Sequence, residues 1–133
     1  MESVGTKSIL IVDDEEGILA ILGTVLKSEG YEVVAALGGE KAIPLIESKE
    51  DKFDLMISDV RMEPINGLQL LKIAVEKRPD MQVIMLTAYG QVETAIEALQ
   101  LGAFDYVKKP FRVDDLLATV QKALSCGDLS QQP

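Results

Sequence analysis

The sequence contains no histidine, and this absence excludes several kinds of catalytic and metal site. The chain cannot form a histidine-based catalytic triad, use an imidazole as a general base, or bind a metal ion through histidine ligands. The single cysteine, Cys126, has no partner within the chain for a disulfide. The candidate functional groups are therefore carboxylates, hydroxyls and lysine ammonium groups.

Long apolar segments and an excess of basic residues are also missing. The apolar runs are too short to span a bilayer, and no basic segment followed by an apolar one precedes the first predicted strand. These features predict a cytoplasmic protein without a membrane contact. The 13 Lys and Arg residues face 22 Asp and Glu residues, which gives a net charge of −9. Such a charge argues against direct nucleic-acid binding and is compatible with Mg²⁺ or a partner with a basic face.

The sequence does contain a regular alternation of strand-like and helix-like segments, and its 133 residues fit one domain. We predict this domain over residues 7–126, with an N-terminal tail at 1–6 and a C-terminal tail or linker start at 127–133. The predicted strands are Ser8–Val12, Tyr31–Ala36, Phe53–Ser58, Gln82–Leu86 and Asp105–Lys108. Helices are predicted at 16–29, 40–49, 91–101 and 113–125, and in a segment that Asn66-Gly67 opens and Arg78-Pro79-Asp80 closes. The helix at 91–101 is expected to bury Val92, Ala95, Ile96 and Leu99.

Strands that alternate with helices predict an α/β fold. The expected architecture is a doubly wound, five-stranded parallel sheet with helices on both faces and the flavodoxin-like strand order 2-1-3-4-5. Ligands of such sheets bind at the carboxyl ends of the strands, where the chain switches direction between strands one and three. Polar residues that follow these strands are therefore candidates for one common site.

Four predicted strands end in such residues. SILIV leads into Asp13-Asp14, LMIS into Asp59, VIML into Thr87, and YVK into Lys109. Lys108 is a competing cation, but the alternation of side chains along a strand should turn Lys108 and Lys109 to opposite sides. The predicted strand order places the three aspartates together, with Thr87 and then Lys109 on the following strands.

Each residue also has an ordinary structural interpretation. Acidic residues at the start of a helix can cap it, Asp59 can be a turn residue, threonine is common in strands, and Lys109 can be a solvated loop residue. Taken together, the four strand ends favour a phosphoryl-transfer site. Clustered carboxylates repel one another unless a cation offsets them, and oxygen ligands favour Mg²⁺ or Mn²⁺ over zinc. Asp59 is then the candidate nucleophile.

Four motifs resemble the receiver domain of two-component response regulators. They are ILIVDDEE, LMISDVRM with NGL downstream, VIMLTAYG, and GAFDYVKKPF, and they cover about Lys7 to Leu124 in the order and spacing of that family. The run TAYGQVETAIEALQLGAFDYVKKPF is most similar to receivers of nitrogen-regulation-type transcriptional activators. Such activators carry an ATPase and a DNA-binding domain further along, and this sequence contains neither.

The resemblance implies a role for each matching residue. Asp59 would accept a phosphoryl group from a phosphohistidine on a sensor histidine kinase or a histidine phosphotransfer protein. Mg²⁺ would be held by Asp14, Asp59 and the backbone carbonyl of Arg61, with Asp13 acting through water. Thr87 and Lys109 would bind the phosphoryl oxygens, and the Lys109-Pro110 peptide bond would be cis.

The resemblance also implies a signalling switch rather than a multiple-turnover enzyme. Thr87 would move towards the phosphoryl group and Tyr106 would move inward. The surface of the fourth helix, fifth strand and fifth helix would then change its preference for an output domain or effector protein. By family analogy, the exposed face near Tyr106 is a candidate homodimer interface. The domain itself is expected to make no direct contact with nucleic acid.

At one point the sequence departs from the family pattern, and two other functions compete with the switch. Met62 is followed by Glu63 and then Pro64, where the family usually has Met-Pro. This difference bears on the loop conformation and the metal affinity. The first alternative is an aspartate-nucleophile phosphatase of the haloacid dehalogenase type, which requires an Asp-x-Asp motif and a substrate-capping insert. The second is a flavodoxin-like cofactor binder, which would want a Ser/Thr/Gly-rich loop where this chain is acidic.

Overall fold

The carboxyl ends of five parallel strands lie on one edge of a single sheet. The computed structural model describes residues 6–48, 50–88 and 92–130, so most of the predicted N-terminal tail and the end of the C-terminal tail lie outside the described residues. The strands are β1 Ser8–Asp13, β2 Glu32–Leu37, β3 Leu55–Asp59, β4 Gln82–Thr87 and β5 Asp105–Lys108. The helices are α1 Glu16–Ser28, α2 Gly39–Glu47, α3 Gly67–Lys77, α4 Val92–Leu101 and α5 Val113–Ser130.

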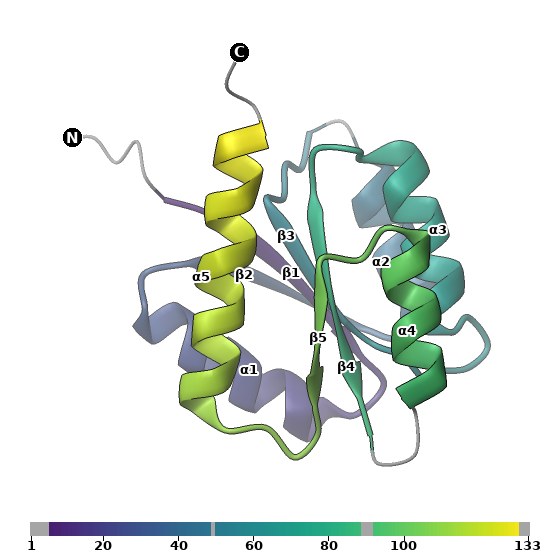
Figure 1. Ribbon diagram of the computed structural model, residues 1–133, viewed down its shortest axis with the longest axis horizontal. Coiled ribbons are helices and arrows are strands. Elements are labelled where there is room, and N and C mark those ends of the chain that lie inside the picture. Colours follow the sequence, from purple (N-terminus) through teal and green to yellow (C-terminus); the bar gives the residue numbers. More distant parts are fainter. Residues whose placement is uncertain (1–5, 49, 89–91, 131–133) are drawn as a thin grey trace.

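The strand order is β2-β1-β3-β4-β5, and every neighbouring pair is parallel. Helices α1 and α5 cover one face of the sheet, and α2, α3 and α4 cover the other (Figure 1). The predicted doubly wound α/β fold and its strand order are therefore confirmed. None of the helices in the described ranges combines the length and apolar character that a bilayer crossing needs.

The alternation of side chains along each strand divides the apolar core between the two faces. Ile9 and Ile11 of β1 pack with α1 and α5, whereas Leu10 and Val12 pack on the opposite side. The two layers differ in composition. The layer under α2, α3 and α4 contains four buried methionines, Met56, Met62, Met81 and Met85, whereas the buried residues of the other layer are nearly all Ile, Leu and Val. Methionine is flexible and adapts to irregular gaps, so the layer under α2, α3 and α4 can repack more easily than the layer under α1 and α5.

Helix α3 begins where the sequence predicts it, because Asn66 provides a complete capping box. The Asn66 side chain accepts a hydrogen bond from the backbone N–H of Gln69 at 2.9 Å, and the Gln69 side chain accepts one from the N–H of Asn66 at 2.9 Å. Two N–H groups that the helix leaves without internal partners are thereby satisfied. The predicted start of a helix at Asn66-Gly67 is confirmed.

Two features of the helices differ from the prediction. Helix α4 packs through Ala95 and Ala98, which are fully buried, whereas Ile96 and Leu99 remain 48% and 39% exposed. The prediction that Ile96 and Leu99 are buried is wrong because the larger apolar residues were assigned to the core face, and alanine fills it instead. The side chain of Val92 lies outside the described residues. Helix α5 continues to Ser130, beyond the predicted end at residue 125, since one glycine costs a helix only about 1 kcal/mol.

The first residue of α3, Gly67, lies against the end of β3. Its backbone N–H donates to the carbonyl of Val60 at 2.8 Å. A methyl group on Gly67 would lie 2.8 Å from the Cα of Val60 and would also overlap the carbonyl oxygen of Asp59. Only a residue without Cβ allows this approach, so Gly67 fixes the position of α3 relative to Asp59.

We predict that Gly67→Ala destabilises the protein by about 1–3 kcal/mol, because the added methyl group must push backbone atoms apart. Gly23→Ala is the matched control. A methyl group on Gly23, within α1, meets no atom within 4 Å, and this change should stabilise the protein by about 0.5–1 kcal/mol. Urea unfolding of both variants measures the two effects. Equal effects of the two substitutions would contradict the close packing at Gly67.

Candidate functional site

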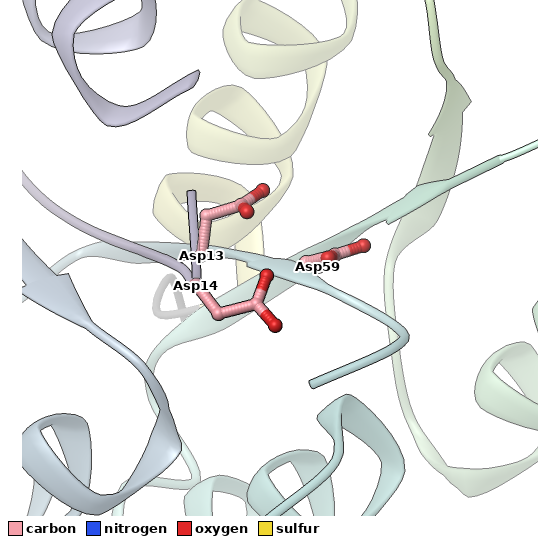
Figure 2. A group of neighbouring side chains, drawn as sticks. All are labelled: Asp13, Asp14 and Asp59. Atoms are coloured by element: carbon pink, nitrogen blue, oxygen red, sulfur yellow. The ribbon is translucent and has the colours of Figure 1, made fainter. Parts of the chain in front are cut away.

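Three carboxylates meet at the carboxyl edge of the sheet. Asp13 is the last residue of β1, Asp14 follows it directly, and Asp59 is the last residue of the neighbouring strand β3. One oxygen atom from each of the three lies within 4.8 Å of the other two. Figure 2 shows the three side chains gathered from these two strand ends. The structure therefore brings together the aspartates that the sequence predicts as a cluster.

Asp13 is fully buried, and both of its carboxylate oxygens have protein partners. Oδ1 accepts a hydrogen bond from the backbone N–H of Glu15 at 3.0 Å, and Oδ2 accepts one from Lys109 Nζ at 2.9 Å. The helix-capping alternative is not supported at α1, because its N-cap residue is Glu15 and no side-chain cap is formed there. Asp14 is exposed, so its carboxylate lies on the solvent side of the cluster.

Lys109 follows the last residue of β5, and its side chain extends towards the aspartates. Its Nζ lies 2.9 Å from Asp13 Oδ2 and 3.4 Å from Asp59 Oδ1. Its backbone N–H donates to the carbonyl of Thr87 at 2.6 Å, which continues the pairing of β4 with β5. Lys108 is exposed, as the alternation of side chains predicts, and the Lys109-Pro110 peptide bond is cis, as expected.

Thr87 and Tyr106 occupy neighbouring positions on β4 and β5. Thr87 is the last residue of β4 and is 2% exposed. Tyr106 pairs in register with Met85, two residues before Thr87. The Tyr106 ring is half-buried and packs against the methionine-containing core layer. Thr87 thus lies at the sheet edge that carries the carboxylates. Tyr106 lies on β5, the strand next to the one that carries Thr87.

The electrostatics of the cluster are unfavourable for ionised Asp59. Burial raises the pKa of the Asp59 carboxyl, and the negative charge of Asp13 raises it further. Lys109 and the backbone N–H of Arg61 act in the opposite direction without cancelling the effect. Burial alone would lower the pKa of Lys109, but its hydrogen bond to Asp13 and its attraction to Asp59 and Asp13 hold that pKa above its ordinary value.

This donor set fits a hard divalent cation. The oxygens are close enough to share one ion, and one of the three side chains is open to solvent. One lysine faces three carboxylates, so negative charge remains in excess. Mg²⁺ and Mn²⁺ take oxygen ligands and keep several waters, which suits a site with one exposed carboxylate.

The loop after β3 contains both the expected family feature and the departure from it. The backbone N–H of Arg61 hydrogen-bonds the Asp59 carboxylate, so this residue lies beside the cluster, where a carbonyl ligand was predicted. Glu63 is exposed, and the Glu63-Pro64 bond is cis. Among the described residues, Glu63 is not part of the carboxylate group that could hold a cation. Its influence on metal affinity remains a prediction.

Two residues at the site are not among those identified from the sequence. The hydroxyl of Ser58, fully buried on β3, donates to the carbonyl oxygen of Asp59 at 3.0 Å. Gly67 packs against the same carbonyl from α3. Both residues therefore fix the peptide that follows Asp59. The close approach of Gly67 could have been predicted from the sequence, because a glycine at the first position of a helix indicates tight backbone packing. A serine inside a buried strand, such as Ser58, gives no such indication.

Comparisons with known proteins identify relatives over most of the chain. The family model described as "Response regulator receiver domain" matches residues 9–121. Transcriptional regulatory protein ZraR of Escherichia coli strain K12 is 43% identical over 117 residues, which cover 88% of this chain and 26% of that protein. Regulatory protein AtoC of the same strain is 40% identical over 124 residues, covering 93% of this chain and 26% of that protein. The chain therefore spans about a quarter of the length of these relatives.

Solved structures give the same result. A response regulator receiver domain protein from Clostridium thermocellum has a TM-score of 0.89 and 30% identity, covering 94% of this chain and 99% of that one. NtrX from Brucella abortus has a TM-score of 0.89 and 30% identity, covering 95% of this chain and 28% of that one. The expected likeness to receivers of nitrogen-regulation-type activators is confirmed by these relatives.

We predict that Asp59→Asn stabilises the metal-free protein by about 0.5–2 kcal/mol, the usual range for a stabilising substitution. The amide removes a buried negative charge beside Asp13. Because the pKa of Asp59 is higher in the folded than in the unfolded protein, acidification protonates the folded form first and stabilises it. The difference in unfolding free energy between the wild type and Asp59→Asn should therefore become smaller as pH falls from 7 towards 4. Thermal unfolding across this range measures it.

The control for this prediction is Asp80→Asn, which makes the same change at an exposed position after α3. It should alter stability by less than about 0.5 kcal/mol at every pH. A wild-type protein more stable than Asp59→Asn at pH 7 without metal would contradict the charge repulsion.

We also predict that Mg²⁺ stabilises the wild-type protein through the three carboxylates. At a free concentration ten times its dissociation constant, the ion should add about 1.4 kcal/mol. Asp14→Asn and Asp59→Asn should each lose most of this gain, and Asp80→Asn should keep it. The shift of the unfolding temperature with MgCl₂ concentration measures the effect. If Asp14→Asn responded to Mg²⁺ like the wild type, Asp14 would not be a ligand.

Proposed function

This chain belongs to the receiver domains of two-component response regulators, and from that membership we propose that Asp59 is its phosphoacceptor. The phosphoryl group would come from a phosphohistidine of a sensor histidine kinase or a histidine phosphotransfer protein in the cytoplasm. Because residues 1–133 contain no histidine, the donor imidazole lies outside this sequence. The reaction makes the domain a signalling switch.

The observation that carries this proposal is the position of Asp59 beside both a carboxylate pair and an ammonium group. Its carboxylate lies 3.4 Å from Lys109 Nζ and within the same cluster as Asp13 and Asp14. A nucleophile for phosphoryl transfer needs cationic groups on both the attacking oxygen and the equatorial oxygens of the phosphoryl group. Lys109 supplies one of them from the chain itself.

The transfer step is a substitution at phosphorus. The bond between phosphorus and the donor imidazole nitrogen breaks while a bond forms between phosphorus and a carboxylate oxygen of Asp59, and the released imidazole takes up a proton. Mg²⁺, when bound, would neutralise charge on the phosphoryl oxygens as a Lewis acid. Lys109, with its raised pKa, remains an ammonium group throughout and would bind one of those oxygens after transfer.

The hydrogen bonds of the aspartates support different roles for them at the metal. Asp14, Asp59 and the backbone carbonyl of Arg61 would hold the ion directly. Both oxygens of Asp13 are already engaged by Glu15 and Lys109, which suits a ligand that acts through water. The charge on Asp13 would then serve chiefly to position Lys109.

The switch would use residues adjacent to the methionine-containing core layer. Thr87 would turn its hydroxyl towards the phosphoryl group, and Tyr106, now half-buried, would move inward. Tyr106 packs against the layer that contains Met85, its neighbour in the sheet. Flexible methionine side chains allow such a rearrangement at low cost. The surface formed by α4, β5 and α5 would change in consequence and alter its affinity for an output domain or effector.

The receiver fold and its relatives do not favour the phosphatase alternative. The curated relatives are about four times longer than the matched region, and they are regulatory proteins by name. We infer that this domain likewise controls an output domain or partner. It would catalyse its own phosphorylation and slow dephosphorylation, without turning over many substrate molecules.

The test is phosphorylation by a small-molecule donor. Incubation with Mg²⁺ and acetyl phosphate should add one phosphoryl group to the wild-type mass, and alkaline pH should remove it. Asp59→Asn should gain none, and Lys109→Ala should gain it at least about 100-fold more slowly, the effect of removing one group that stabilises the transition state. Asp80→Asn should behave as wild type. Intact-mass spectrometry over time measures all four proteins.

Two outcomes would overturn the proposal. One is an adduct on Asp59→Asn equal to that on the wild type, which would place the phosphoryl group elsewhere. The other is sustained phosphate release from acetyl phosphate without any adduct, which would indicate a phosphatase. If the donor leaves the wild type unmodified, a phosphorylated histidine phosphotransfer protein replaces it, and absence of transfer from that donor as well would refute the proposal.

A further inference from the structure

Strand β2 lies at an edge of the sheet and presents an open row of backbone groups. In the described part of the chain, β1 is its only strand neighbour. The N–H of Glu32 donates to Lys7, before β1, at 2.9 Å, and the N–H of Gly38 donates to Asp13 at 2.9 Å. Alternate residues of a strand point their backbone groups to opposite sides. The N–H and C=O groups of Val33, Ala35 and Leu37 therefore point away from β1, towards the open edge.

The sequence of this edge offers little protection against pairing with another strand. Its sequence, EVVAAL, contains no lysine, no proline and a single charge. Val34 and Leu37 are 40% and 36% exposed, and Ala35 is exposed as well. The opposite edge strand, β5, is shorter, ends in the exposed Lys108 and is followed by Pro110. Long apolar edge strands without protection favour addition of a further strand.

We propose that β2 pairs with β2 of a second copy of this chain, in antiparallel orientation around a two-fold axis at Ala35. Strand pairing of this kind is isologous, since each copy offers the same surface. With Ala35 opposite Ala35, the outward backbone groups of Val33 face those of Leu37 in the other copy. Each strand then donates three hydrogen bonds and accepts three, and the two sheets join into one.

The side chains of β2 match this register. Val33 lies opposite Leu37 and Val34 lies opposite Ala36, so the cross-strand pairs on both faces are apolar. The one charged residue, Glu32, lies opposite Gly38 rather than opposite another Glu32. An unrelated peptide would have to meet the same pattern, whereas the chain's own strand already does. This surface is separate from the face near Tyr106, which lies on the other edge strand.

Net charge sets the expected salt dependence of this dimer. Each copy carries a charge of −9, so two copies repel one another over long range. Salt screens this repulsion but leaves backbone hydrogen bonds and apolar contacts nearly unchanged. The dimer formed through β2 should therefore tighten as NaCl concentration rises, in contrast to an interface held by salt bridges.

The test compares lysine substitutions on two exposed apolar surfaces of the full chain. Ala35→Lys places two ammonium groups opposite one another across the axis and should raise the dimer dissociation constant at least about tenfold. Ile96→Lys makes a similar change on α4, where the side chain is 48% exposed, and should leave the constant unchanged. Sedimentation equilibrium over a concentration series measures all three proteins, and thermal unfolding verifies that both variants are folded.

A disulfide gives an independent test of the register. In a Cys126→Ser background, Ala35→Cys should form a disulfide between two copies under mild oxidation. Directly opposed, hydrogen-bonded residues have Cα atoms about 5.5 Å apart, within the range that a disulfide spans. Ile96→Cys in the same background should form no disulfide between copies.

The proposal is overturned if the wild-type chain stays monomeric at high concentration and high salt. It is also overturned if Ile96→Lys dissociates the dimer while Ala35→Lys does not, because the dimer would then use the α4 surface. None of these results depends on phosphorylation of Asp59, so the two proposals stand or fall separately.

Discussion

The burial of Asp59 beside the negative charge of Asp13 is the constraint on which the rest of the site depends. The sheet forces the ends of β1 and β3 together, and burial removes much of the water that would otherwise separate the charges. The raised pKa of Asp59 expresses the cost of this arrangement. Lys109 offsets part of it from β5, and a divalent cation can offset more. A carboxylate held in this way is disfavoured as an anion, and a positive ion beside it offsets part of that cost.

The backbone around Asp59 is closely packed. Ser58 and Gly67 both touch its carbonyl, and the capping box of Asn66 fixes the start of the helix that carries Gly67. These contacts hold the peptide that carries the carboxylate while its charge state changes. The core layer on the same side of the sheet contains the buried methionines, whereas the layer under α1 and α5 is built from stiffer aliphatic residues. The closely held Asp59 thus adjoins an adaptable core layer, which suits a domain that converts a local charge change into a change of surface.

Much of the fold and the position of the site follow from the sequence. Each apolar strand that ends in a polar residue can be recognised locally, and in a parallel sheet all these strand ends lie at the same edge. Parallel strand order then brings Asp13, Asp59, Thr87 and Lys109 to one edge, and alternation along β5 separates Lys108 from Lys109. Details that depend on how two surfaces meet could not be predicted. The rotation of α4 buries Ala95 and Ala98 and exposes Ile96 and Leu99. The contact of Gly67 with Asp59 likewise depends on tertiary packing.

The central claim is that the carboxylate selected by this geometry, and no other, carries the phosphoryl group. Borohydride reduces an acyl phosphate to an alcohol, so it converts a phosphorylated aspartate to homoserine. After reaction with acetyl phosphate and Mg²⁺, reduction and trypsin digestion, the peptide from Phe53 to Arg61 contains two candidate aspartates, Asp54 and Asp59. Fragmentation of this peptide should place homoserine at position 59. Homoserine at position 13, 14 or 54 instead would contradict the account.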